Sequence, residues 1–178
     1  MAGQFDGGKD RMDDALKPAE RDAPRGVVFD LDGTLVDSVP DIHAATAVFL
    51  EERGHRPLDL ATITGFVGNG VPVLLERVLR AVGEAHDAAA VEAALPRFMA
   101  IYGAAPSALS TLFPGVAETL ATLQTKGFRL GVCTNKPLAP ARQVLADFGI
   151  DGCFAAVVGG DSLAARKPDP APLRHTAE

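Results

Sequence analysis

The sequence predicts an α/β fold, a doubly wound parallel sheet of the Rossmann-like kind with an inserted all-helical cap. Short apolar runs suited to buried strands occur at 26–30, 128–134 and 154–158. Residues 40–106 instead carry apolar residues at helical spacing, without strand-like alternation. An order of strand, helical insert and then alternating helices and strands predicts parallel pairing with right-handed crossovers.

Composition excludes several classes of protein. The chain has 178 residues, with 17 Lys and Arg against 23 Asp and Glu and a net charge of −6. Its apolar fraction of 47% argues against wholesale disorder. The negative charge argues against a nucleic-acid partner, and no stretch is apolar enough to predict a membrane partner. Two cysteines cannot form a disulfide framework, which favours the cytoplasm.

Residues 1–24 are expected to form a mobile tail. They mix acidic residues with glycine and lysine and have no apolar stretch, so a signal peptide is not expected. A start site at Met12 or later is the alternative. The predicted core domain then comprises residues 25–39 and 107–178, and residues 40–106 form the cap.

The first predicted strand, 26–30, is β-branched and aromatic and stops at an acid. The first cap helix begins at Pro40, because proline suits the first turn of a helix, and ends at Gly54. Apolar spacing predicts two more cap helices, over 71–82 and 91–102.

From residue 114 onward, predicted helices and strands alternate. The expected elements are a helix at 116–126, a strand at 128–134, a helix at 138–148 and a strand at 154–158. Glycines suited to a left-handed terminal position follow both helices. Ligands of such sheets lie beyond the carboxyl ends of the strands, and Asp30, Thr134 and Asp161 are expected at these ends.

Asp30 and Asp32 stand together on a tight turn after the first strand. Such a pair can ligate a hard cation such as Mg²⁺, or act as a nucleophile and a proton carrier. An acidic turn or helix cap is the alternative. Gly33 would expose backbone N–H groups and Thr34 a hydroxyl, which favours a phosphate cradle.

Two later segments offer further groups for phosphate. Thr134 and Asn135 end the second strand with a hydroxyl and adjacent N–H groups, although such residues more often cap a helix. Lys167 is held extended by Pro168 and would neutralise a phosphoryl group. A solvated lysine is the alternative.

Three segments, in order, resemble the motifs of the haloacid dehalogenase superfamily: Asp30–Ser38, Thr134–Pro137 and Lys167–Pro170. Segments 40–43, 65–72 and 113–116 further resemble the bacterial phosphoglycolate phosphatases of that superfamily. The resemblance implies Mg²⁺-dependent hydrolysis of 2-phosphoglycolate to glycolate and phosphate. It also implies that the cap closes over the site.

The resemblance also implies residue roles. Asp30 would be the nucleophile that forms an aspartyl phosphate, and Asp32 would protonate the leaving alkoxide and later activate water. Mg²⁺ would bind Asp30 and the backbone carbonyl of Asp32. Thr134 and Asn135 would hold phosphate oxygens, and Lys167 would balance charge. Because a halide leaves without a proton, the second acid favours a phosphatase over a dehalogenase.

The cap segment Gly68-Asn69-Gly70 would face the substrate by the same resemblance, although a plain turn is the alternative. The partner is therefore expected to be a small-molecule phosphate ester. The oligomeric state is not predicted.

The sequence departs from the family pattern after Lys167. Family members carry a fourth, acidic motif there, but only Asp169 and Glu178 are acidic among the eleven residues that follow Lys167. The resemblance therefore implies a truncated member whose last core strands are missing. A related capped phosphatase, a pyrophosphatase, a phosphosugar mutase and a catalytically impaired fragment remain the alternatives.

Overall fold

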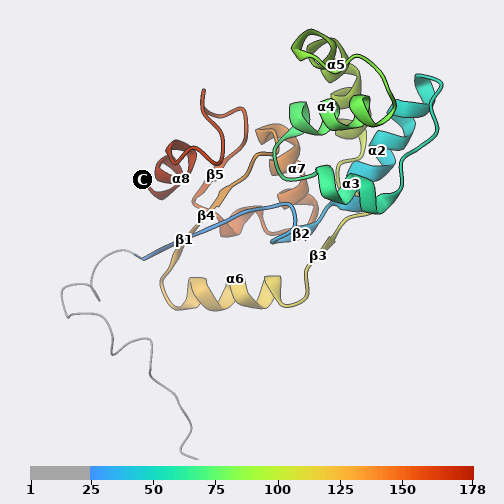
Figure 1. Ribbon diagram of the computed structural model, residues 1–178. Coiled ribbons are helices and arrows are strands. Elements are labelled where there is room, and N and C mark those ends of the chain that lie inside the picture. Colours follow the sequence, from blue (N-terminus) through green and yellow to red (C-terminus); the bar gives the residue numbers. More distant parts are fainter. Residues whose placement is uncertain (1–24) are drawn as a thin grey trace, which may run out of the picture.

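The computed structural model describes residues 25–178, so the predicted tail at 1–24 lies outside the described residues. Figure 1 shows a sheet with flanking helices and, beside it, a bundle of helices formed by the middle of the chain. The predicted α/β fold class is confirmed. None of the helices described is both long and apolar enough to cross a bilayer.

In chain order the elements are β1 (Gly26–Phe29), β2 (Val36–Asp37), α2 (Val39–Glu52), α3 (Leu60–Phe66), α4 (Val71–Ala81), α5 (Ala88–Ala104), β3 (Thr111–Leu112), α6 (Val116–Thr125), β4 (Arg129–Cys133), α7 (Leu138–Asp147), the 3₁₀ turn η1 (Asp151–Cys153), β5 (Ala156–Val158) and α8 (Ala171–Ala177).

The main sheet has the strand order β1-β4-β5, and both pairs are parallel, as expected. Phe29 pairs with Val132, and Cys133 pairs with Val158. β4 is central and buried along four of its five residues, whereas β1 is exposed or half-buried throughout. Within residues 25–178, no strand pairs with the other side of β1, which makes β1 a sheet edge.

Helix α8 packs against all three strands of the main sheet. A side chain at Gly131 of β4 would bring its Cβ within 2.7 Å of Thr176 Cγ2, so this close packing requires glycine. The sequence did not predict α8, because Pro170 and Pro172 suggest a loop. The structure places Pro172 in the first turn, where the missing N–H costs no helical hydrogen bond.

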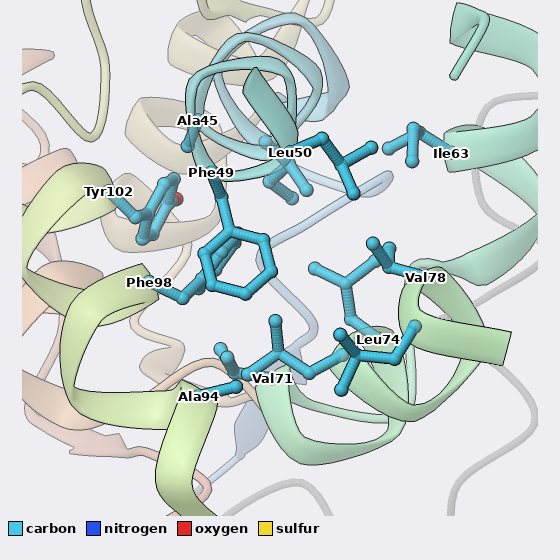
Figure 2. Close-up of a cluster of buried hydrophobic side chains, with 13 residues drawn as sticks. Ala45, Phe49, Leu50, Ile63, Val71, Leu74, Val78, Ala94, Phe98 and Tyr102 are labelled. Atoms are coloured by element: carbon cyan, nitrogen blue, oxygen red, sulfur yellow. The ribbon is translucent and has the colours of Figure 1, made fainter. Parts of the chain in front are cut away.

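Helices α2–α5 form a helical bundle with its own hydrophobic core (Figure 2). Phe49 of α2 meets Phe98 of α5 edge to face, with ring centroids 5.9 Å apart. Phe98 in turn stacks on Tyr102 with centroids 6.2 Å apart. From Val39 to Ala104 the described elements are all helical, as predicted, and α3 is an addition. The boundaries of the cap and core as separate domains stay a prediction.

The bundle is joined to the sheet by two chain segments that are tied to each other. β2 and β3 pair antiparallel, with Val36 opposite Leu112. The buried Asp41 of α2 accepts a hydrogen bond from Leu109 N at 2.9 Å and another from the Ser110 hydroxyl. Strands of two residues are too short for periodicity to reveal, so the sequence did not predict this link.

Candidate active site

Asp30 and Lys167 form an ion pair at the carboxyl end of the sheet. The Lys167 Nζ lies 2.8 Å from Asp30 Oδ2 and donates at 2.8 Å to the carbonyl oxygen of Cys133, the last residue of β4. Asp30 Oδ1 accepts from Leu31 N at 2.8 Å. The Asp30 side chain is 42% exposed, so a ligand can reach it. The structure thus brings together two residues that the sequence predicted separately.

Asp32 is more enclosed, with its side chain 14% exposed. Its Oδ1 accepts hydrogen bonds from Ser38 Oγ at 2.6 Å and Lys136 Nζ at 2.9 Å. Lys136 was not among the predicted site residues, although it belongs to the segment Thr134–Pro137. Lysine is usually solvated, and only the fold shows that this side chain is 3% exposed.

Tyr102, on helix α5, covers the Lys136 ammonium, which lies 4.8 Å from the centroid of the tyrosine ring. Burial alone would lower the pKa of Lys136, but the charge of Asp32 and the contact with Tyr102 outweigh it and raise that pKa. Burial raises the pKa of the Tyr102 hydroxyl, and the nearby ammonium opposes that rise. Lys136 is therefore a cation held between an acid and an aromatic face.

Thr134 and Asn135 follow β4, as predicted. Thr134 is buried, and its Oγ1 accepts from Lys136 N at 3.1 Å. The Asn135 Nδ2 donates to Gly68 O at 3.0 Å and to Lys167 O at 3.2 Å. Asn135 Oδ1 is buried and has no hydrogen-bond partner in the part of the chain that the structure describes. Asn135 thus connects the helical bundle to the loop that carries Lys167. Its Oδ1 remains a buried acceptor without a donor among the described residues.

These side chains line a small cavity between the sheet and the helical bundle, with a volume of about 50 Å³. Its lining residues are Asp30, Asp32, Ile42, Val67, Gly68, Gly70, Val71, Leu74, Phe98, Tyr102, Thr134, Asn135 and Lys136. The sheet supplies the charged groups, and the bundle supplies a mostly apolar wall.

The segment of Gly68, Asn69 and Gly70 is only partly placed as predicted. Gly68 and Gly70 line the cavity, whereas Asn69 is exposed and does not. Gly70 has a φ of 86°, and a Cβ there would lie 3.2 Å from Asn135 O. A left-handed backbone and this close approach both require glycine.

The phosphate cradle expected at Gly33 and Thr34 stays a prediction, although the backbone N–H groups of both residues already have partners within the turn. The N–H of Gly33 donates to Val36 O at 2.9 Å, and the N–H of Thr34 donates to Leu31 O at 3.2 Å. Both residues are exposed and lie outside the cavity lining. With a φ of 78°, Gly33 turns the chain back on itself, so these N–H groups close the turn.

Asp161 follows β5, the third strand of the main sheet, but its carboxylate binds the start of a helix. Its Oδ1 accepts from Leu138 N at 2.8 Å, at the start of α7. It therefore caps the helix from a neighbouring loop, and it does not line the cavity with Asp30 and Asp32.

The carboxylate oxygens of Asp30 and Asp32 are ligands of the kind that Mg²⁺ prefers. Mg²⁺ is commonly bound by one or two carboxylates together with waters and substrate phosphate. Asp30 and Asp32 supply oxygen donors at one cavity, and Asp30 is open to solvent. No group of three or more His, Cys, Asp or Glu suited to a metal occurs within residues 25–178.

A parallel sheet carries two acids and two lysines at its carboxyl end, and a helical bundle lies over them. Together with the family match and the relatives described next, this arrangement identifies a phosphoric monoester hydrolase. Residues 24–178 match the family described as haloacid dehalogenase-like hydrolase, and the chain belongs to this family.

Relatives support the assignment. The chain is 57% identical over 152 residues to the phosphoglycolate phosphatase of Cereibacter sphaeroides, a match that covers 85% of this chain and 70% of that protein. It is 47% identical over 155 residues to the phosphoglycolate phosphatase of Rhodospirillum rubrum, covering 85% of this chain and 64% of that one. The crystal structure of a predicted phosphoglycolate phosphatase from Haemophilus somnus matches with a TM-score of 0.78 and 33% identity, over 85% and 69% of the two chains.

Proposed function

We propose that the protein is a Mg²⁺-dependent phosphatase that hydrolyses 2-phosphoglycolate to glycolate and phosphate through an aspartyl phosphate on Asp30. The observation that carries this proposal is the contrast between the two acids. Asp30 is open and paired with Lys167, whereas Asp32 is enclosed and held by Lys136 and Ser38. An accessible carboxylate suits a nucleophile, and an enclosed one suits a proton carrier.

The charges of the site support a divalent cation. Asp32 must hold a proton to act as the donor of the first step, so Asp30 carries one negative charge against the two positive charges of Lys136 and Lys167. A dianionic phosphoryl group would leave the site with one uncompensated negative charge at short range. When bound, Mg²⁺ would offset this charge on the phosphoryl oxygens.

The proposed reaction has two steps. In the first, a carboxylate oxygen of Asp30 bonds to phosphorus while the bond from phosphorus to the leaving oxygen breaks, and Asp32 gives that oxygen its proton. In the second, Asp32 takes a proton from water as the water oxygen attacks phosphorus. The bond from phosphorus to Asp30 then breaks, phosphate leaves, and both acids return to their starting states. Lys167 would hold Asp30 and balance the charge of the transferring group.

The size of the cavity favours a short leaving group. A volume of about 50 Å³ leaves less room for a phosphosugar than for the two-carbon glycolate. The choice of 2-phosphoglycolate over a phosphosugar, and therefore over a mutase, is supported by this size and by the phosphoglycolate phosphatase relatives.

The test is phosphate release from 2-phosphoglycolate, pyrophosphate and a panel of phosphosugars, each with Mg²⁺ and with excess chelator. We expect 2-phosphoglycolate to give the largest kcat/KM and the chelator to stop its turnover. The exposed Asp151 has no hydrogen bond from its side chain among the described residues, so Asp151→Asn is the matched control for changes to the acids. Faster turnover of a phosphosugar than of 2-phosphoglycolate would contradict the substrate assignment.

A further inference from the structure

Lys136 occupies an unusual place between the sheet and the helical bundle. Its backbone is fixed by two hydrogen bonds, from Lys136 N to Thr134 Oγ1 at 3.1 Å and from Gly160 N to Lys136 O at 2.8 Å. Gly160 permits this approach, because a Cβ there would lie 2.3 Å from Asn135 O. The ammonium therefore projects from a rigid base.

The Lys136 ammonium contacts one residue beside the sheet, Asp32, and one residue of the helical bundle, Tyr102. On the sheet side it donates to Asp32 Oδ1 at 2.9 Å, and on the bundle side it lies 4.8 Å from the centroid of the Tyr102 ring. Tyr102 stacks on Phe98, and Phe98 meets Phe49 in the centre of the bundle (Figure 2). A continuous series of side-chain contacts thus runs from the bundle core to Asp32.

The hydrogen bonds to Asp32 leave its Oδ2 oxygen available for proton transfer. Both Ser38 and Lys136 donate to Oδ1, and within residues 25–178 no hydrogen bond reaches Oδ2. Two donors on Oδ1 fix the carboxylate and direct its free oxygen. Ser38 lies between β2 and α2, at the junction of the sheet and the bundle, whereas the Tyr102 ring over Lys136 is part of helix α5.

We propose that Lys136 is a positioning residue that orients Asp32 for proton transfer, and that Tyr102 secures its ammonium only while helix α5 is docked on the sheet. When the bundle docks on the sheet, Tyr102 therefore fixes Lys136, and Lys136 in turn orients Asp32. Asp32 is then poised for proton transfer when the cavity is covered and water is excluded. This inference rests on the proposed role of Asp32 as the proton donor.

The test compares an alkyl ester, 2-phosphoglycolate, with p-nitrophenyl phosphate, whose leaving group needs no proton. We expect Lys136→Met to lower kcat/KM for the alkyl ester by on the order of 10²-fold, a loss at the lower end of what a general acid contributes, and to change kcat/KM for the aryl ester little. This ratio reports phosphoryl transfer to Asp30 and not the later hydrolysis step, in which Asp32 activates water for both esters. Tyr102→Leu should show the same selectivity, and Tyr102→Phe, which keeps the ring but loses the hydroxyl beside Lys136, should show a smaller loss. Lys136→Arg should restore part of the alkyl activity, and Lys126→Met, at an exposed lysine, is the matched control.

Asp32→Asn separates the two proposals. If Asp32→Asn lowers kcat/KM for both esters equally, the proton-donor role of Asp32 is wrong and the proposed mechanism fails with it. If Asp32→Asn is selective for the alkyl ester but Lys136→Met is not, only the inference about Lys136 is overturned. The double variant should be no more impaired than Asp32→Asn alone, because Lys136 acts through Asp32.

A second measurement needs no turnover. Tyr102 is the sole tyrosine of a chain without tryptophan, so its fluorescence reports this contact alone. The Tyr102 side chain is buried, and acrylamide should quench it weakly in the wild type. We expect Lys136→Met to increase the quenching and Lys126→Met to leave it unchanged. Equal quenching in Lys136→Met and wild type would overturn the link between Lys136 and docking of α5.

Discussion

Lys167 Nζ and Asp30 Oδ2 lie 2.8 Å apart, and the same ammonium donates to the last carbonyl of β4. One cation therefore fixes the open acid at the end of β1 to the neighbouring strand. The pair is partly exposed, so its value lies in holding Asp30 and in offsetting the charge of a phosphate more than in stabilising the fold.

Replacing Lys167 tests this arrangement. In Lys167→Met, a dianionic ester would face Asp30 without the neighbouring cation, and we expect kcat to fall by about 10²–10³-fold. Because the ion pair is partly exposed, the melting temperature should change little. Steady-state phosphate release and thermal unfolding of the same sample provide the two measurements. A normal kcat in Lys167→Met would remove this residue from the catalytic set.

The two acids should respond differently to amide substitution. Asp30→Asn should abolish hydrolysis of every ester, because a neutral amide cannot attack phosphorus. Asp32→Asn should retain attack but lose proton transfer, so that hydrolysis of 2-phosphoglycolate falls by about 10²–10⁴-fold. Trapping of phosphate on the protein, followed by mass spectrometry of radiolabelled or rapidly quenched samples, would check the order of the steps. Labelling of Asp30→Asn would contradict the assignment of the nucleophile.

Closure of the helical bundle over the cavity is a separate prediction. If residues 40–106 move as a cap, the segments near Val39 and at 107–113 act as hinges. Substrate or a phosphate mimic should then slow hydrogen exchange at both hinges and at Gly68–Val71. Helix α6, which packs on β4 away from the cavity, is the internal control. Exchange that is unchanged at saturating ligand would argue against a lid that closes.

The surface of the bundle offers a test of pH-dependent stability. Glu84 forms ion pairs with Arg53 and with His55. The hydrogen bond from Arg53 lowers the pKa of Glu84 against the opposing effect of burial, and His55 lowers it further. Because the folded pKa is depressed, the stabilisation is present above the unfolded value of about 4.3 and is lost as the pH falls through the lower folded value.

Glu84→Gln should therefore reduce the free energy of unfolding by about 0.2–1 kcal/mol at neutral pH, the range of a partly exposed ion pair. The difference from wild type should shrink as the pH falls from the unfolded value of about 4.3 through the lower folded pKa, where the carboxylate takes up a proton. Chemical denaturation at a series of pH values measures it, with the exposed Glu92→Gln, beyond the first turn of α5, as control. A difference that persists undiminished in acid would show that Glu84 acts through packing and not through charge.

The sequence predicts features that depend on neighbours along the chain and misses those that depend on distant ones. Buried strands and amphipathic helices follow from local apolar patterns, and the ends of the strands follow from their order. Lys136 meets Asp32 across 104 positions of sequence, so no local pattern distinguishes it from a solvated lysine. The N–H of Gly33 donates to Val36 O within its own turn, an arrangement that only backbone geometry reveals.

The free edge of β1 leads to the last prediction. Val27, Val28 and Phe29 are only half-buried, and in the described part of the chain their outer side has no strand partner. Such an edge invites pairing with other chains. The Cereibacter sphaeroides relative is longer, since the match covers 70% of it. By the family resemblance, a further segment of that relative would carry an acidic motif and strands that can pair with β1.

Fusing that segment after Glu178 should raise the free energy of unfolding, reduce aggregation and increase phosphatase activity. Each large apolar side chain that becomes fully buried contributes about 1.5–3 kcal/mol, which is substantial against a typical domain stability of about 5–15 kcal/mol. Urea denaturation, light scattering and phosphate release would measure the three effects, with a glycine-serine extension of equal length as control. If the 178-residue chain is monomeric, unfolds cooperatively and equals the extended protein in stability and rate, then β1 needs no further strand.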